Sequence, residues 1–237
     1  SSFVSPRTRN TTTPGLSAER VLGVDASYNL RYGDFKARIS GYYTRIYDQS
    51  KVISYYDDVA ATFTNFAMSG IDKVHFGLEA AVSIPIYHTL ALNGAVSWGQ
   101  YTYDSNPYYL QTQDNSGDIV SDGYVYWKDF RVESTPQTAV NVGLSWRSNN
   151  NMYLSMSPIY RTDAVITGGM APGDIEHLRR QEKFDSAYTL NASIGKNWYI
   201  HRKYTLGFSL DVKNILNNQD IKTGGYEQTR LSKNTET

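Results

Sequence analysis

Residues 73–86 read KVHFGLEAAVSIPI, and each even-numbered position from Val74 to Ile86 is apolar. The odd-numbered positions between them are mostly polar or small, and include Lys73, His75, Gly77, Glu79 and Ser83. Successive side chains of a β-strand point to opposite faces, so this unbroken register predicts a strand with one apolar face and one polar face.

The same alternation recurs along the chain in the segments 24–32, 35–43, 90–98, 140–146, 188–194 and 204–212. A weaker candidate covers residues 152–160, where the alternation is poor and Pro158 lacks the backbone N–H that a sheet ladder needs. Together these segments predict an antiparallel sheet of eight strands, seven of them with a regular pattern.

The connections between the predicted strands alternate in length. The short ones fall at residues 33–34, 87–89, 148–151 and 198–203, and the long ones at 49–71, 104–137, 162–186 and from 214 onward. An up-and-down sheet would therefore carry its short turns on one rim and its long loops on the other. Outer-membrane β-barrels have this asymmetry, with short periplasmic turns and long extracellular loops.

Charges and aromatic rings are sorted in the way a lipid-facing wall requires. Most charged strand residues share the polar face: Asp25, Arg31, Lys36, Arg38, Lys73, Glu79, Asp211 and Lys213. An Arg or Lys facing lipid at mid-depth would cost about 2–4 kcal/mol. Arg45 has the parity of the apolar face, but it lies near the loop end of its strand, where the penalty is small. Aromatic residues near the short turns are Tyr32, Phe35, Tyr87, Trp146, Trp198, Tyr199 and Tyr204, and those toward the long loops are Tyr43, Tyr47, Trp98, Tyr101 and Tyr103. We expect these two groups to form girdles at the two membrane surfaces.

The composition narrows the function classes. Lys plus Arg and Asp plus Glu both number 23, which argues against nucleic acid as a partner. There is no cysteine, so disulfides and thiolate chemistry are excluded. The 20 tyrosines, 8 phenylalanines and 4 tryptophans are many for a chain with a mean hydropathy of −0.49. No run reaches the roughly 18–20 apolar residues of a membrane-spanning helix, so the sequence predicts spanning by strands.

No catalytic, cofactor or metal site is predicted. The four histidines, at positions 75, 88, 177 and 201, lie on separate elements without ligand spacing. No Ser, His and Asp set stands in a recognisable triad context.

The most suggestive loop, 104–137, contains five aromatic residues: Tyr108, Tyr109, Tyr124, Tyr126 and Trp127. Such rings could stack on a sugar, a peptide or a siderophore while neighbouring Asp and Gln side chains supply hydrogen bonds. The alternative is that the rings pack the loop against its neighbours.

Residues 211–228 read DVKNILNNQDIKTGGYEQ. This segment resembles the late barrel region of Bacteroidetes TonB-dependent outer-membrane receptors. Further matches to that pattern are residues 65–72, Tyr126-Trp127, residues 131–138 and residues 153–162. The resemblance covers nearly the whole chain.

The resemblance implies a 22-stranded barrel that is closed by an N-terminal plug domain and takes up a siderophore, peptide or glycan with energy from the TonB complex. The implied partners are outer-membrane lipid, the receptor's own plug and remaining strands, the TonB complex through the plug, and a surface lipoprotein. We expect residues 1–237 to be a single segment of that barrel, with the plug and the final strands outside it.

Two alternatives remain. The first is a complete eight-stranded outer-membrane barrel that serves as an anchor or adhesin, because eight strands also close a barrel. The second is a soluble β-sandwich binding module, whose strands would alternate in the same way.

Overall fold

The computed structural model describes residues 13–57, 61–113, 116–133, 136–150, 152–162, 165–167, 181–201, 203–220 and 230–231. Its main feature is one antiparallel sheet in the order β1-β2-β3-β4-β7-β8-β11-β12. The strands are β1 (Arg20–Tyr32), β2 (Phe35–Asp57), β3 (Thr62–Tyr87), β4 (Leu90–Tyr103), β7 (Thr138–Arg147), β8 (Met152–Thr162), β11 (Ala187–Ile200) and β12 (Tyr204–Val212). The chain is thus all-β and up-and-down, as predicted.

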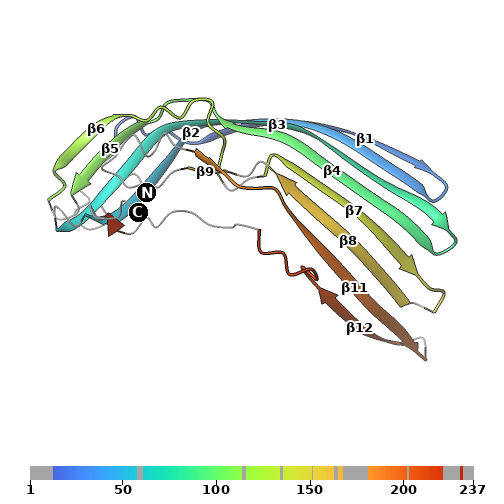
Figure 1. Cartoon of the computed structure of the whole chain (residues 1–237). Helices are drawn as coiled ribbons and strands as arrows, with labels where there is room; N and C mark the ends of the chain where they lie inside the picture. Colours follow the sequence, from blue (N-terminus) through green and yellow to red (C-terminus); the bar gives the residue numbers. More distant parts are fainter. Residues whose placement is uncertain are drawn as a thin grey trace.

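The sheet is open and curved (Figure 1), and within the described residues β1 and β12 do not pair with each other. Smaller strands accompany it: β5 (Tyr108–Gln113), β6 (Ile119–Tyr124), the pair β9 (Val165–Thr167) and β10 (Gln181–Lys183), and β13 (Arg230–Leu231). None of the described segments is a helix that could cross a membrane.

The four short turns lie at one end of the sheet (Figure 1). Gly33, with φ of +57°, and Asp34 join Tyr32 to its partner Phe35. A left-handed backbone at this corner suits glycine because it has no Cβ. The β7–β8 turn is closed by the Ser148 N–H, which donates to the Met152 carbonyl oxygen at 2.8 Å. These turns confirm the predicted hairpins.

The weak strand at residues 152–160 is a full member of the sheet. β8 pairs with β11 from Arg161↔Ala187 to Met152↔Lys196 without interruption. On its other side, the pairing with β7 lacks the two positions between Ile159 and Met156. The gap includes Pro158, which has no N–H to donate. One interrupted ladder is therefore tolerated because the other is complete.

The prediction of two long loops is wrong in part, because both segments contain strands. Residues 49–71 do not form a loop, because β2 and β3 continue as a paired extension from Lys51↔Met68 to Asp57↔Thr62. Residues 104–137 contain the hairpin of β5 and β6, and β5 pairs with β3. Phe66, Ala67, Met68 and Ser69 are consecutive and all buried. Their burial on both faces removes the alternation that would have revealed a strand.

The other long connections are partly described. In the predicted loop 162–186, the short strands β9 and β10 pair with each other. Residues 163–164 and 168–180 of that connection lie outside the described residues, as do residues 221–229 of the one after 214.

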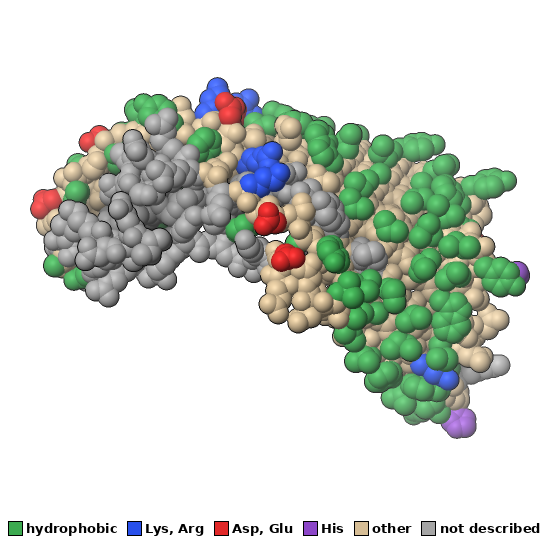
Figure 2. Space-filling view, viewed as in Figure 1, with side chains coloured by type: hydrophobic (Ala, Val, Ile, Leu, Met, Phe, Trp, Pro, Cys, Tyr) green, Lys and Arg blue, Asp and Glu red, His purple; other side chains and the backbone are tan. Residues whose placement is uncertain are grey.

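The apolar face of the sheet is exposed along the turn-side half of the strands. Leu78, Leu206, Phe208 and Leu210 each expose more than half of their surface. Figure 2 shows hydrophobic side chains spread over this part, with charged side chains concentrated nearer the opposite end. A sheet that exposes so much apolar side chain on one face fits a lipid environment.

The two predicted groups of aromatic residues lie toward the two ends of the sheet, with three exceptions. Tyr32, Tyr87 and Tyr204 are highly exposed near the short turns, and Trp98 is exposed at the other end of the apolar face. Tyr199 is also exposed, but it is the register partner of Thr205 on the polar face. Tyr101 and Tyr103, however, are register partners of His75 and Lys73 on the polar face. Their odd-numbered positions follow the polar residues of β4, so they belong to the interior side and not to a girdle.

Candidate functional site

The end of the sheet opposite the short turns is built up by the β5–β6 hairpin. β5 lies beside β3 from Ser69↔Tyr108 to Thr64↔Gln113, and β6 pairs with the far side of β5. Ser105 fixes the start of the hairpin, since its Oγ donates to the Gly70 carbonyl oxygen at 2.6 Å and accepts from the Asp72 N–H at 2.8 Å. Gly70 and Asp72 both lie just beyond Lys73, the last β3 residue that pairs with β4.

A loop core lies under this hairpin, made of Phe66, Met68, Ile71, Tyr103, Tyr109, Val125 and Trp127. The rings of Phe66 and Tyr109 stack with centroids 4.9 Å apart, and those of Tyr103 and Trp127 lie 4.8 Å apart. Tyr109 is 3% exposed and Trp127 1% exposed. These two predicted site residues, Tyr109 and Trp127, therefore pack the β5–β6 hairpin against β3 and β4.

The other three predicted residues, Tyr108, Tyr124 and Tyr126, are the hairpin tyrosines. Tyr124 and Tyr126 expose 60% and 55% of their surface. The ring of Tyr108 meets that of Tyr124 edge-on at 5.5 Å, and its hydroxyl donates to Asp122 Oδ2 at 2.6 Å. The hydrogen bond to this carboxylate raises the pKa of Tyr108 above its ordinary value. The hairpin tyrosines thus include two exposed rings, and one of these, Tyr124, is held in place by contact with Tyr108.

Below the loop core, the polar face carries a tyrosine pair that the sequence did not single out. Tyr42 on β2 and Tyr101 on β4 share a hydroxyl–hydroxyl hydrogen bond, with their rings stacked at 6.5 Å. Two glycines make room for them, because a Cβ on Gly77 or on Gly99 would lie 2.6 Å from the Tyr42 Oη. The sequence shows only that each of two neighbouring strands has a glycine in its interior, and the structure shows that Gly77 and Gly99 face each other across β3 and β4.

Higher on the same face, Tyr103 joins the wall to the returning loop. Its hydroxyl donates to Glu133 Oε2 at 2.5 Å, and Lys73 Nζ lies 5.4 Å from its ring centroid. Burial and the neighbouring Glu133 carboxylate raise the pKa of Tyr103, whereas burial lowers the pKa of Lys73. Both groups lie beyond the level of Trp98, at the end of the sheet that carries the β5–β6 hairpin.

At the other end of the polar face, near the short turns, Arg31, Lys36 and Arg38 form a basic patch. It lines a hollow of about 440 Å³ together with Asn29, Ser83 and Asn93. Arg31 and Lys36 stand directly opposite each other in the β1–β2 register. The ion pairs found among the described residues, Arg20–Asp48 at 2.9 Å and Arg45–Asp104 at 2.6 Å, do not include them. The basic patch is therefore not neutralised within the described part of the chain.

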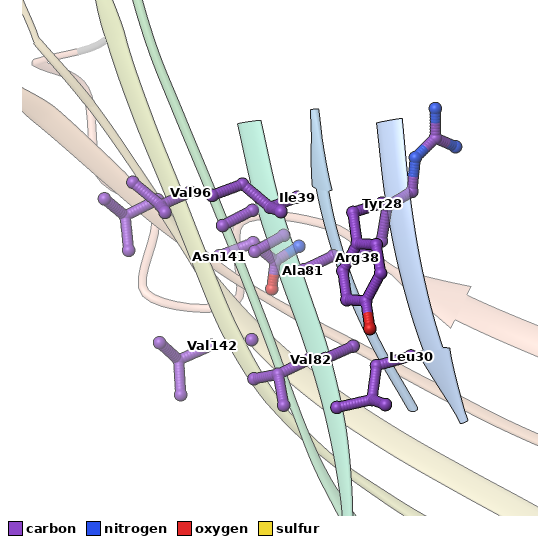
Figure 3. Close-up of a pocket in the computed structure, with 14 residues that line it drawn as sticks. Tyr28, Leu30, Arg38, Ile39, Ala81, Val82, Val96, Asn141 and Val142 are labelled. Atoms are coloured by element: carbon purple, nitrogen blue, oxygen red, sulfur yellow. The ribbon is translucent and has the colours of Figure 1, made fainter. Parts of the chain in front are cut away.

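A separate hollow of about 500 Å³ lies mainly on the apolar face. Tyr28, Ile39, Val82, Val96 and Val142 are among its lining residues, and Figure 3 shows the Arg38 guanidinium directed away from these side chains. The hollow exists because three of the lining residues on this face have small side chains or none: Ala37, Ala80 and Gly94. It is part of the apolar face of the sheet.

Within the described segments, no three His, Asp or Glu side chains gather in a way that could hold a metal ion. That the chain has no catalytic residue or cofactor stays a prediction.

Comparison with protein families matches residues 2–215 to the family described as TonB dependent receptor-like, beta-barrel. Searches of curated proteins and of solved structures found no match. The matched range includes every strand of the main sheet, the hairpin tyrosines and the basic patch. The chain therefore belongs to the TonB-dependent receptor-like β-barrel family.

Proposed function

We propose that this chain forms part of the wall and external loops of a bacterial outer-membrane transporter, one that takes up a scarce ligand with energy from the TonB complex. The family match over residues 2–215 is the observation that carries the proposal. The sorted faces support it, with the apolar face toward outer-membrane lipid and the polar face toward the lumen. The short turns are then periplasmic and the β5–β6 hairpin extracellular. The sequence resemblance supports a Bacteroidetes source.

The ligand is a siderophore, a peptide or a glycan, and the hairpin tyrosines are its first contacts. Tyr124 and Tyr126 support this role because their exposed rings stand on a hairpin held by a buried core. Aromatic rings with polar tips suit ligands that are partly apolar and partly hydrogen-bonding. Tyr109 and Trp127 contribute by fixing the hairpin, since their rings are buried. No residue in this proposal is catalytic and no cofactor takes part.

The polar face would meet the plug domain and the remaining strands of the barrel. The basic patch supports a plug contact near the periplasmic end, because like charges directly opposite on paired strands are unfavourable unless an anion lies between them. Arg31 and Lys36 are such a pair. Carboxylates on the plug would supply the missing charge. A surface lipoprotein is proposed as a further partner on the basis of the family resemblance alone.

The second candidate is a small closed barrel that serves as an anchor or adhesin. Closure would require β1 to pair with β12, and these strands do not pair among the described residues. An open curved sheet favours the wall of a larger barrel.

The test compares growth of a strain lacking the full receptor, a strain lacking TonB and the parent. Each strain receives one limiting nutrient at a time: ferric siderophore, a casein peptide digest, or a complex glycan. We expect one nutrient on which both deletions impair growth to a similar degree. Unimpaired growth of the receptor deletion on all three, or receptor-dependent growth that does not need TonB, would overturn the proposal.

A further inference from the structure

The outer edge of the β5–β6 hairpin is an unpaired strand edge. Within the described residues, β6 pairs with β5 alone, and Figure 1 shows it at the margin of the structure beyond β5. Ile119 and Val120 are 61% and 51% exposed on this strand. β6 contains neither proline nor lysine, the residues that often protect exposed edges. Its pairing with β5 is irregular at Val120 and regular from Ser121 to Tyr124, which is the stretch considered below. An edge of this kind can accept another strand.

The hydrogen-bond alternation shows which backbone groups face the open side. The Val125 N–H donates to the Pro107 carbonyl oxygen at 2.9 Å, in the same register as Gly123↔Tyr109. In an antiparallel pair, bonded and non-bonded residues alternate. The N–H and C=O groups of Asp122 and Tyr124 therefore point away from β5, toward the free edge.

Side chains of defined chemistry stand beside these free backbone groups. Asp122 and Tyr124 are two residues apart, so their side chains share one face of the hairpin. The ring of Tyr124 is exposed and supported edge-on by Tyr108, whose hydroxyl is bonded to the Asp122 carboxylate. No ion pair within the described residues neutralises Asp122. The edge thus combines backbone donors and acceptors with one negative charge and one aromatic ring.

We propose that the β6 edge binds an extended peptide as an added antiparallel or parallel strand. A Lys or Arg side chain of the peptide lies beside Asp122, and a neighbouring side chain on the same face of the peptide contacts the ring of Tyr124. Backbone pairing supplies affinity that does not depend on sequence, and alternate side chains supply selectivity. Glycans lack the repeating backbone N–H and C=O groups that this edge pairs with, and a siderophore wrapped around its metal does not present such groups in an extended row. The inference rests on the proposed uptake function and assigns peptides as its ligand class.

The first experiment uses the detergent-solubilised full-length receptor and a tryptic casein digest, whose peptides end mostly in Lys or Arg. Retained peptides are identified by mass spectrometry, and the most enriched one is synthesised with single N-methyl groups at successive positions. Each methyl group removes one backbone donor. We expect affinity to fall about three- to tenfold at alternate positions only, as expected for one lost hydrogen bond each. No retained peptide, or equal losses at all positions, would overturn the proposal.

The second experiment compares Tyr124→Pro with Tyr124→Ala. Both variants lose the ring, but only proline removes the N–H on the free edge, where it breaks no bond to β5. We expect the proline variant to bind the enriched peptide at least about threefold more weakly than the alanine variant. Equal affinities in two folded variants contradict strand addition. Heat-modifiable migration of the barrel on gels verifies folding.

A charge variant gives an independent measurement if Tyr124→Pro does not fold. Asp122→Asn should weaken binding of a Lys-containing peptide while leaving its norleucine analogue nearly unchanged. An equal effect on both peptides contradicts the assigned position of the cation. If no peptide binds but another nutrient still requires the receptor and TonB, the peptide inference fails and the proposed uptake function stands. If growth never requires TonB, the uptake function fails whatever the binding result.

Discussion

The hydroxyl of Tyr42 lies over Gly77, so close that a Cβ added to this glycine would be 2.6 Å from the Tyr42 Oη. The same Cβ would lie 2.4 Å from the Trp98 carbonyl oxygen, which is backbone and cannot swing aside. The tyrosine thus covers a part of the polar face that has no side chain of its own. Aromatic residues that lie over glycines are a known way of fixing register in curved sheets.

Replacement of this glycine should destabilise the wall. Gly77→Ala is expected to lower the free energy of unfolding by about 1–3 kcal/mol, the usual cost of overpacking. Gly94→Ala is the matched control, because its Cβ would meet only a Val82 methyl carbon at 3.3 Å and no backbone atom within 4 Å. Urea unfolding of the refolded receptor in detergent measures both. Equal losses in the two variants would mean that the tyrosine cover is unimportant.

The link between Tyr103 and Glu133 should make stability sensitive to alkaline pH. The folded pKa of Tyr103 is raised above the ordinary tyrosine value of about 10. As the pH rises above that value, the unfolded chain loses the Tyr103 proton while the folded chain keeps it, so stability falls. Tyr103→Phe should flatten this decline between pH 9 and about 11. Parallel curves for the two proteins over this range would exclude the predicted contribution.

The strand core could be read from sequence because the two faces of the sheet carry opposite kinds of side chain, so that neighbouring residues alternate. That is why residues 73–98 show the alternation so clearly. The rule stops at Phe66–Ser69, where β2 and β5 flank β3 and consecutive residues are buried. The extension of β2 and β3 was therefore mistaken for a loop.

The candidate site was only partly predictable for a related reason. An aromatic-rich loop is visible in the sequence, but whether a ring is buried depends on which strand the loop packs against. Trp127 and Tyr126 are adjacent, yet one is 1% exposed and the other 55%. The Tyr42–Tyr101 pair needed the register of three strands, which sequence spacing alone does not supply.

This difference between Trp127 and Tyr126 gives a third prediction. Trp127→Ala should destabilise the hairpin by about 3–5 kcal/mol locally, because a large buried side chain leaves a cavity. Tyr126→Ala should change local stability little, since its ring is mostly exposed. Hydrogen exchange of the β5 and β6 amides reports both effects. Faster exchange in Tyr126→Ala than in Trp127→Ala would reverse the assigned roles.

Two adjacent alanines test the assignment of the faces through stability. Ala80 belongs to the apolar face and Ala81 to the polar face. Ala80→Arg should cost about 2–4 kcal/mol if it lies near the bilayer midplane, whereas Ala81→Arg should cost much less. Folding equilibria in lipid vesicles measure the difference. A larger penalty at position 81 than at position 80 would mean that the lipid-facing and lumen-facing sides are assigned the wrong way round.

The central claim is that the chain is a membrane wall with lipid on one face and the lumen on the other. Because the chain has no cysteine, single cysteines can carry nitroxide labels at each position from 74 to 86 in the full receptor, once any cysteines elsewhere have been replaced. Collisions with oxygen report lipid, and collisions with a water-soluble nickel chelate report water. The account predicts a period of two, with oxygen favoured at even positions and no such preference at odd ones. Equal access of the nickel chelate to both sets of positions would contradict it.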